Sequence, residues 1–180
     1  MTRYSQGSEN ISTITLDGNT LSSTEIWRAA KNNLQIQLSN DSWDRIIKSR
    51  QVVDEILESG EVVYGINTGF GSLVNQTISG DDLQQLQVNL IRSHATGIGE
   101  LMSRESVRCM MIVRINSFAK GFSGVHPNVV QQLIDFVNLD ITPAVPRIGS
   151  LGASGDLAPL SHMALALIGE GEVLGAEGGV

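Results

Sequence analysis

Apolar side chains recur at helical spacing through most of the chain between residues 41 and 139. In the clearest run, 41–59, an apolar stripe keeps the helical period and Gly60 supplies a stop signal. Similar runs predict a helix from after Ser79 to about residue 92, one between Ser103 and Gly121, and one over 126–140, where Pro127 stands early enough to be tolerated. The pattern therefore predicts a mainly α fold.

Two short segments near the N-terminus alternate between apolar and polar residues instead. These are 11–16, which ends in an Asp-Gly-Asn turn signal, and 34–39. Between them lies STEIWRAAKN, a short helical run that Ser22 or Ser23 can cap. We expect a small antiparallel β element with a helical connection, acting as scaffold.

The last part of the chain differs in composition from the rest. Residues 149–180 hold 8 of the 19 glycines, and the run from Leu157 to Ile168 is apolar on nearly every face. A helix of that kind is buried on all sides. Because the 12 residues that follow Ile168 are too few to cover it, we expect another subunit or a further C-terminal portion to do so.

Length and charge limit the range of functions. The 180 residues amount to about one domain, at roughly 150 residues per domain. We divide them into a flexible tail over 1–10, a globular and mostly helical domain over 11–148, and a glycine-rich loop with the start of the buried helix over 149–180. The formal net charge of −7 argues against nucleic acid or anionic lipid as a partner.

Cysteine and histidine usage favours a reducing compartment and no metal. The lone Cys109 cannot form an internal disulfide, and no Cys or His cluster has the spacing of a zinc site. The N-terminus lacks the apolar core of a signal peptide, and no window reaches the ~18 apolar residues of a membrane span. We expect a cytoplasmic protein without a membrane partner.

The glycine-rich segment does not fit the common nucleotide or hydrolase motifs. No Lys follows a glycine pair as a P-loop requires, and the dinucleotide fingerprint G-x-G-x-x-G is missing, so no nucleotide cofactor is expected. The hydrolase elbow G-x-S-x-G comes close at Gly152 and Ser154, but Asp156 occupies its last position.

What remains is the tripeptide Ala153-Ser154-Gly155, followed by Asp156 and the apolar helix. This arrangement suits backbone cyclisation, because a glycine amide nitrogen can closely approach the carbonyl carbon of Ala153. Ser154 can then lose its hydroxyl as water, which leaves an electrophilic alkene in a five-membered ring.

At this point the sequence resembles the histidine and aromatic amino-acid ammonia-lyases and aminomutases, most closely the bacterial histidine ammonia-lyases. These enzymes form a 4-methylideneimidazole-5-one group (MIO) from Ala-Ser-Gly. The resemblance covers about residues 11–173, in the family's order. Its motifs are YGINTGFG at 64–71, NLIRSHATGIG at 89–99, KGFSGV at 120–125, ITPAVPRIGS at 141–150 and GSLGASGDLAPLSH at 149–162.

The resemblance implies a role for each matching residue. Ala153, Ser154 and Gly155 would form the MIO group, which takes up the substrate amine and makes it a leaving group. Asp156 would assist cyclisation or fix the loop. The helix that starts at Leu157 would support the ring with its positive N-terminal end.

Two further motifs would supply the base and the substrate contacts. Tyr64 matches the family's catalytic base, and a phenol needs basic neighbours or helix ends to serve in that role. Gly65 would keep its loop close-fitting and contact the substrate, and Asn67 would supply a polar contact with it. His94 stands where members with polar-ring substrates carry Ser-His, which favours L-histidine, with urocanate and ammonia as products.

Several residues have simpler interpretations. His126 lies beside a proline at a helix start and His162 lies within an apolar helix, so both are interpreted as structural. Cys109 is interpreted as packing. The basic residues are interpreted as a solvated or inter-subunit face; they are Arg92, Arg104, Arg108, Arg114 and Lys120.

Three alternatives remain open at this level. The substrate could be tyrosine or another aromatic amino acid, and the reaction could be 2,3-amino migration in place of elimination. An alternative of another class is a non-catalytic module that pairs through its apolar helix. The resemblance implies a homotetramer whose site draws on several subunits, with an amino acid as the small-molecule partner.

Overall fold

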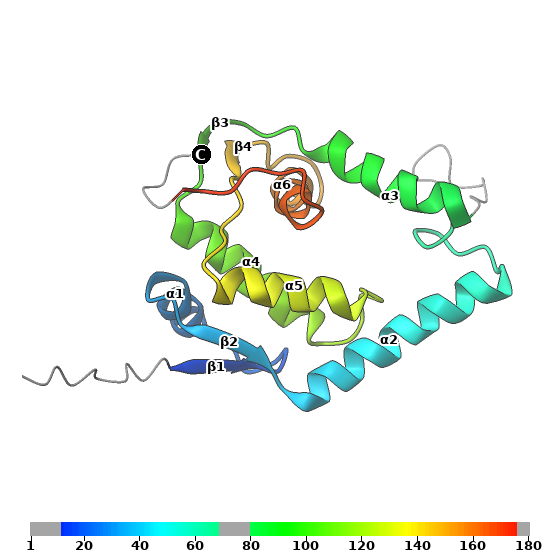
Figure 1. The fold of residues 1–180 in the computed structure, drawn as a ribbon, viewed down its shortest axis with the longest axis horizontal. Coiled ribbons are helices and arrows are strands. Elements are labelled where there is room, and N and C mark those ends of the chain that lie inside the picture. Colours follow the sequence, from blue (N-terminus) through cyan, green and yellow to red (C-terminus); the bar gives the residue numbers. More distant parts are fainter. Residues whose placement is uncertain (1–11, 69–79, 176–180) are drawn as a thin grey trace, which may run out of the picture.

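The computed structural model describes residues 12–68 and 80–175 (Figure 1). The predicted tail over 1–10 and the capping role of Ser79 lie outside the described residues. The mainly α fold class is confirmed, with short strands between the helices. The elements are β1 (Thr13–Leu16), α1 (Ser23–Lys31), β2 (Gln35–Leu38), α2 (Asn40–Ser59), α3 (Gly80–His94), β3 (Ile98–Leu101), α4 (Arg104–Phe118), α5 (Pro127–Asn138), β4 (Pro146–Ile148) and α6 (Leu157–Leu167).

The helices begin and end where local chemistry directs. Ser22 caps α1 in a capping box, in which its hydroxyl accepts from the Glu25 N–H and the Glu25 carboxylate accepts from the Ser22 N–H. Gly60 ends α2 in the left-handed conformation, with φ of 71°. Ser103 caps α4, and Pro127 is the first residue of α5. These signals confirm the helices predicted from the sequence.

The strand pair near the N-terminus corrects one expectation. β1 and β2 do pair, with Thr13 opposite Gln35 and Leu16 opposite Leu38, but they run parallel and not antiparallel. A parallel pair needs a crossover of a dozen or more residues, and the connection that contains α1 supplies it. The helical connection already present in the sequence should have indicated the parallel arrangement.

A second, antiparallel pair joins segments that are distant in the sequence. β3 pairs with β4, and Ile98 lies opposite Ile148. Next to this pair, two glycines bring their backbones close together. A Cβ atom built on Gly149 would lie 2.9 Å from the Cα of Gly97. The pairing therefore places the end of α3 beside the start of the glycine-rich loop.

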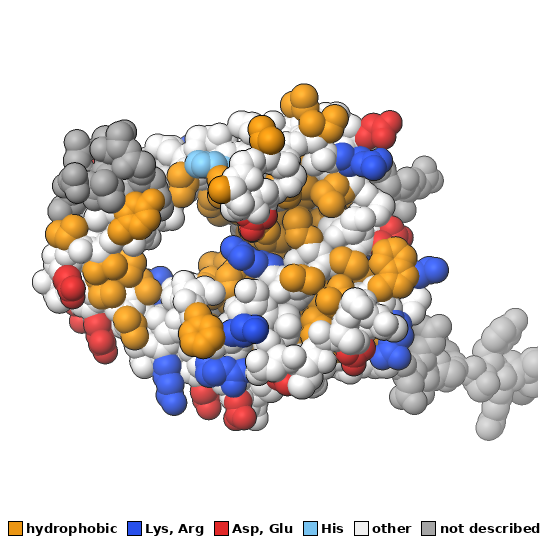
Figure 2. Space-filling view, turned by 180° about the vertical axis from the view of Figure 1, so that it is seen from behind, with side chains coloured by type: hydrophobic (Ala, Val, Ile, Leu, Met, Phe, Trp, Pro, Cys, Tyr) orange, Lys and Arg blue, Asp and Glu red, His pale blue; other side chains and the backbone are white. Residues whose placement is uncertain are grey.

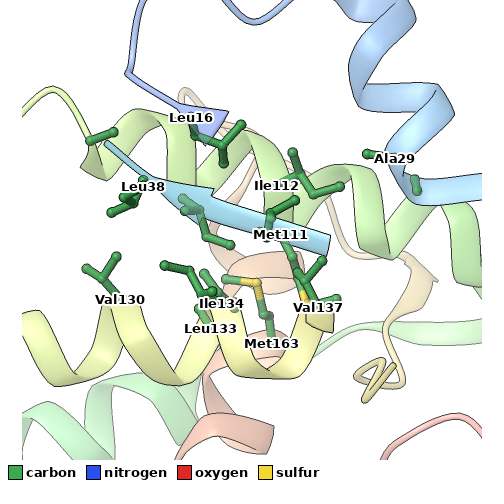
Figure 3. Close-up of a cluster of buried hydrophobic side chains, with 14 of the residues drawn as sticks. Leu16, Ala29, Leu38, Met111, Ile112, Val130, Leu133, Ile134, Val137 and Met163 are labelled. Atoms are coloured by element: carbon green, nitrogen blue, oxygen red, sulfur yellow. The ribbon is translucent and has the colours of Figure 1, made fainter. Parts of the chain in front are cut away.

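The main core lies between α4, α5, α1 and the β1–β2 pair, as the close-up shows (Figure 3). Each of these elements contributes fully buried side chains to one continuous cluster. Its largest members include Leu16, Ile36, Met111, Ile112, Ile115, Leu133 and Val137. Met163 of α6 reaches the same cluster, so the segment after residue 148 packs on the common core.

One arginine is fully buried beside this core, which contradicts the interpretation of Arg108 as part of a solvated or inter-subunit face. Its side chain has no exposed surface. Its Nε donates to the Ala30 carbonyl at 3.1 Å, and its Nη1 donates to the Val137 carbonyl at 2.9 Å and to the Asp140 carboxylate at 3.2 Å. Arg108 therefore joins the C-terminal turns of α1 and α5 to α4.

α6 lies between α3, α5 and β4 and is seen end-on in Figure 1. Only Ala158, Met163 and Ala166 of this helix are buried, and the Leu157 side chain is 52% exposed. The described residues thus cover part of a helix whose sequence suits burial on all sides. None of the helices over 12–68 and 80–175 is both long enough and apolar enough to cross a membrane.

We predict that Arg108→Met lowers the free energy of unfolding by about 2–3 kcal/mol, because two helix-end carbonyls lose their buried donor. The check is the urea midpoint, monitored by circular dichroism. Arg104→Met is the matched control: Arg104 also contacts Asp140, but its side chain is 29% exposed, and a loss below about 1 kcal/mol is expected. Equal losses would contradict the anchoring role of Arg108.

Candidate functional site

The loop that carries Tyr64 is held by the side chain of Asn67. The Asn67 amide oxygen accepts from the Val63 N–H at 2.9 Å, and its nitrogen donates to the Glu61 carbonyl at 2.6 Å. Asn67 is buried, whereas the Tyr64 side chain is 62% exposed. The amide thus fixes the loop from within, and its predicted contact with substrate stays a prediction.

His94 is the last residue of α3, and its ring is fixed by that helix. Its Nδ1 lies 2.8 Å from the Leu90 carbonyl oxygen. A carbonyl can only accept a hydrogen bond, so Nδ1 carries the proton, and Nε2 of the neutral ring is an acceptor. The hydroxyl of Ser93 lies 3.1 Å from the same Nδ1.

Tyr64 and His94 meet at one cavity of about 380 Å³, although they come from different elements. Leu90 and Ile91 of α3 supply its apolar wall, and Leu157 and Ser161 of α6 close the side nearest the glycine-rich loop. Ser161 carries no signal in the sequence as a site residue, because only the helical turn after Leu157 brings it to this cavity.

A second cavity, of about 400 Å³, lies between the end of α3 and the glycine-rich loop. It shares His94 and Leu157 with the first cavity. Its remaining lining comes from the end of α3, the loop after β4 and the first turn of α6, namely Ser93, Thr96, Gly149, Leu151, Gly152 and Ala158. The predicted supporting residue Leu157 therefore stands between the two cavities.

The Ala153-Ser154-Gly155 tripeptide lies beside these cavities without lining either of them. Ala153 and Ser154 are exposed, and Gly155 is half-buried with φ of 72°. The Ser150 hydroxyl donates to the Gly155 carbonyl and so closes the loop on itself. Asp156 is the N-cap residue of α6, but its carboxylate makes no capping hydrogen bond.

This loop has the features that cyclisation requires of its residues. Gly155 has a left-handed backbone that an L side chain would strain, and a Cβ there would have only the Ser150 hydroxyl near it, at 3.7 Å. The tripeptide ends just before the positive end of α6. The chain around Ser154 therefore fits the MIO group.

Gly65 lies apart from the two cavities at His94. It lines a larger cavity of about 880 Å³ between α2, α3 and residues 123–129, which include the end of the KGFSGV motif. The space-filling view shows an opening in the molecule that hydrophobic side chains border (Figure 2). The structure thus places Gly65 and Tyr64 at different cavities, and the predicted substrate contact of Gly65 stays a prediction.

His126 and Cys109 have structural positions. His126 is the N-cap of α5, where its Nδ1 accepts from the Asn128 N–H at 3.2 Å. Cys109 is half-buried, and burial raises the pKa of its thiol. Within 12–68 and 80–175, no group of three or more His, Cys, Asp or Glu side chains gathers closely enough to hold a metal ion.

The fold is that of the aromatic amino acid lyases. The model of the aromatic amino acid lyase family matches residues 21–178. The chain belongs to this family.

Named relatives agree with this assignment. Histidine ammonia-lyase of Geobacillus thermodenitrificans is 48% identical over 161 residues, which are 89% of this chain and 32% of that protein. Histidine ammonia-lyase of Staphylococcus aureus (strain JH9) is 51% identical over 162 residues, which are 90% of this chain and 32% of that protein. The chain thus spans about a third of the length of the curated relatives it matches.

Solved structures show the same fold. The crystal structure of histidine ammonia-lyase from Trypanosoma cruzi has a TM-score of 0.84 and 36% identity, over 93% of this chain and 32% of that one. Tyrosine aminomutase from Streptomyces globisporus has a TM-score of 0.84 and 36% identity, over 92% of this chain and 31% of that one.

We predict that Asn67→Ala loosens the Tyr64 loop, because a backbone donor and a backbone acceptor both lose their partner. Amide hydrogen exchange of a peptide covering 61–68 should rise about tenfold, as expected for loss of about 1–2 kcal/mol of local stability. Asn67→Asp is the control, since it keeps the acceptor for the Val63 N–H. Its exchange should lie between that of the unsubstituted protein and that of Asn67→Ala. Unchanged exchange together with a raised KM would instead support the substrate contact predicted from the sequence.

Proposed function

We propose that the protein is an ammonia-lyase that converts L-histidine to urocanate and ammonia, using an MIO group formed from Ala153, Ser154 and Gly155. The observation that carries this proposal is the cavity at which Tyr64 and His94 meet beside the first turn of α6. The Ala-Ser-Gly loop directly precedes that turn.

The loop residues have separate roles in this proposal. The MIO group supplies the electrophile that takes up the substrate amine. Gly155 provides the amide nitrogen for cyclisation, and the hydrogen bond from Ser150 to the Gly155 carbonyl holds the loop closed. Asp156 and the N-terminal end of α6 provide polar groups beside the ring, and the positive end of the helix favours negative charge there.

Tyr64 is the proposed base that removes the β-proton of the substrate. Tyr64 lines the same cavity as His94, and the Asn67 side chain holds its loop from within. A base of this kind has to lie within hydrogen-bond reach of the proton that it removes. Attachment to a fixed loop on one wall of the cavity meets that requirement better than a free surface position would.

His94 is the proposed contact with the substrate ring. Because its Nδ1 is bonded to the Leu90 carbonyl, its Nε2 can accept a hydrogen bond from a ring donor. The imidazole N–H of L-histidine is such a donor, whereas the phenyl ring of phenylalanine has none. A site built around an acceptor rejects a ring that leaves the acceptor unpaired.

A phenol hydroxyl would satisfy the same acceptor, so tyrosine is the alternative substrate. The likeness to tyrosine aminomutase supports this alternative. Elimination and 2,3-amino migration would use the same loop, base and ring contact, and differ in whether ammonia leaves the pocket before it adds again.

We further propose that the working site is completed by other parts of a homo-oligomer, as a homotetramer. The support is the apolar surface around the two cavities: the side chains of Leu151, Tyr64 and Leu157 are 86%, 62% and 52% exposed. Apolar surface of this kind marks a contact site more often than a free surface.

We predict that Ser154→Ala abolishes ring formation. The unsubstituted protein should be lighter than its sequence by two waters in intact mass spectrometry, whereas Ser154→Ala should have its full sequence mass and only background production of urocanate. Ser117→Ala, at an exposed serine of α4, is the control and should keep both properties. Undiminished turnover by Ser154→Ala would refute the proposed chemistry, and an unsubstituted protein of full sequence mass would favour the non-catalytic module.

We predict that His94→Leu lowers kcat/KM for L-histidine by about 10–100-fold, because the donor of the substrate ring is then buried without a partner. Turnover of phenylalanine should stay equal or increase. The measurement is an ultraviolet assay with histidine, tyrosine and phenylalanine. His126→Asn, which keeps a capping side chain away from the two cavities at His94, should leave all three rates unchanged. Faster turnover of phenylalanine than of histidine by the unsubstituted protein would overturn this role of His94.

A further inference from the structure

His162, interpreted from the sequence as structural, makes a specific contact with a distant backbone segment. Its Nε2 accepts a hydrogen bond from the Gly97 N–H at 3.0 Å. A backbone N–H can only donate, so Nε2 is deprotonated and the neutral ring carries its proton on Nδ1. Burial lowers the pKa of His162, which keeps the ring in this form. The acidic residues that line the adjoining cavity with it are Glu170, which is paired with Arg92, and Glu172.

Gly97 lies in the linker between His94 and β3, and the other two N–H groups of this linker have local partners. The Ala95 N–H donates to the Ile91 carbonyl at 3.1 Å, and the Thr96 N–H donates to the His94 carbonyl at 2.8 Å. Only the Gly97 N–H reaches a different element. The bond to His162 is therefore the polar tether of linker 95–97 to α6.

The same contact leaves no room for side chains. A Cβ atom on Gly97 would lie 2.9 Å from the Nε2 of His162, and one on Gly149 would lie 2.9 Å from the Cα of Gly97 and 3.3 Å from the Cβ of Ala158. The imidazole of His162 thus packs against Gly97 of the linker, and Gly97 packs against Gly149 of the glycine-rich loop. Real Cβ atoms do not approach this closely, so each segment limits the position of the next.

We propose that His162 is a positioning residue that fixes linker 95–97, and with it His94, against the glycine-rich loop that carries Ser154. The inference rests on the proposed function for its effect on catalysis, but the contact itself is independent of that function. His162 does not line the cavities at His94 and acts on the site through Gly97.

Three substitutions separate the hydrogen bond from the bulk of the ring. His162→Gln can place an amide oxygen about as far from the backbone as Nε2, so it keeps an acceptor for the Gly97 N–H. In His162→Asn the amide oxygen lies too close to the backbone of residue 162 to reach the Gly97 N–H. His162→Phe keeps a ring without an acceptor. Hydrogen exchange is compared for peptides covering 95–101 and 148–156, with 107–115 of the core as internal reference.

In His162→Phe and His162→Asn, we expect exchange of both site peptides to rise about tenfold, as for the loss of one partly buried hydrogen bond, with the core peptide unchanged. His162→Gln should remain close to the unsubstituted protein. In the enzyme assay, KM for L-histidine should rise about tenfold in His162→Phe while kcat changes less than about threefold, because His94 contacts the ring and not the reacting bond.

The outcomes that overturn the proposal are specific. Unchanged exchange in His162→Phe and His162→Asn would show that the bond does not hold the linker, and loosening that His162→Gln fails to correct would show that the acceptor is not the cause. Loosening without a change in KM would remove the positioning role. If the unsubstituted protein has no ammonia-lyase activity, the proposed function fails. Hydrogen exchange of both site peptides would still test the role of His162 in that case. Loosening confined to 95–101 would overturn the proposed link to the loop that carries Ser154.

Discussion

Where residues 97 and 149 meet, the two backbones are so close that neither position has room for a side chain. A side chain on Gly149 would collide with the backbone of Gly97, and one on Gly97 would collide with the ring of His162. The approach brings the end of α3 beside the glycine-rich loop, and the pairing of Ile98 with Ile148 extends it. This contact, together with the packing of α3 on α6, places His94 and Ser154 in one region of the molecule.

The main core serves as the fixed support for that contact. α4 lies at its centre, and Arg108 ties the ends of α1 and α5 to it through buried hydrogen bonds. The buried side chains cluster on α4, α5 and the β1–β2 pair, whereas the residues at the two cavities at His94, Ala158 excepted, are half-buried or exposed. The packed core thus supports the site, and the loops that carry Tyr64 and Ser154 lie at the edge of this core. Binding residues are usually placed on loops of a scaffold in this way.

The sequence predicted what depends on neighbours along the chain and failed where distant segments decide. Ser22, Gly60, Ser103 and Pro127 end or begin helices through bonds within a few residues, so their signals could be read directly. The existence of the β3–β4 pair depends on which segments meet in space, whereas the direction of the β1–β2 pair could have been inferred from the helical connection between the two strands. The same limit explains His162: its residue type fits many roles, and only the fold shows that it holds a distant backbone segment.

The position of α6 connects the chemistry proposed here with the incomplete burial of that helix. Its apolar sequence suits burial on all sides, yet its first residue, Leu157, is half exposed at the point where the two cavities meet. An electrophile formed at Ser154 needs protection from water, and closing a site against water also strengthens its electrostatic contacts. A segment that covers the free side of α6 would also cover Leu151 and Tyr64. The same contact would therefore bury the helix and close the site. This explains why a largely apolar helix directly follows the cofactor-forming loop: on the proposed function, the site becomes dry only when the assembly forms, and a reactive group would be most exposed to water while the chain is alone.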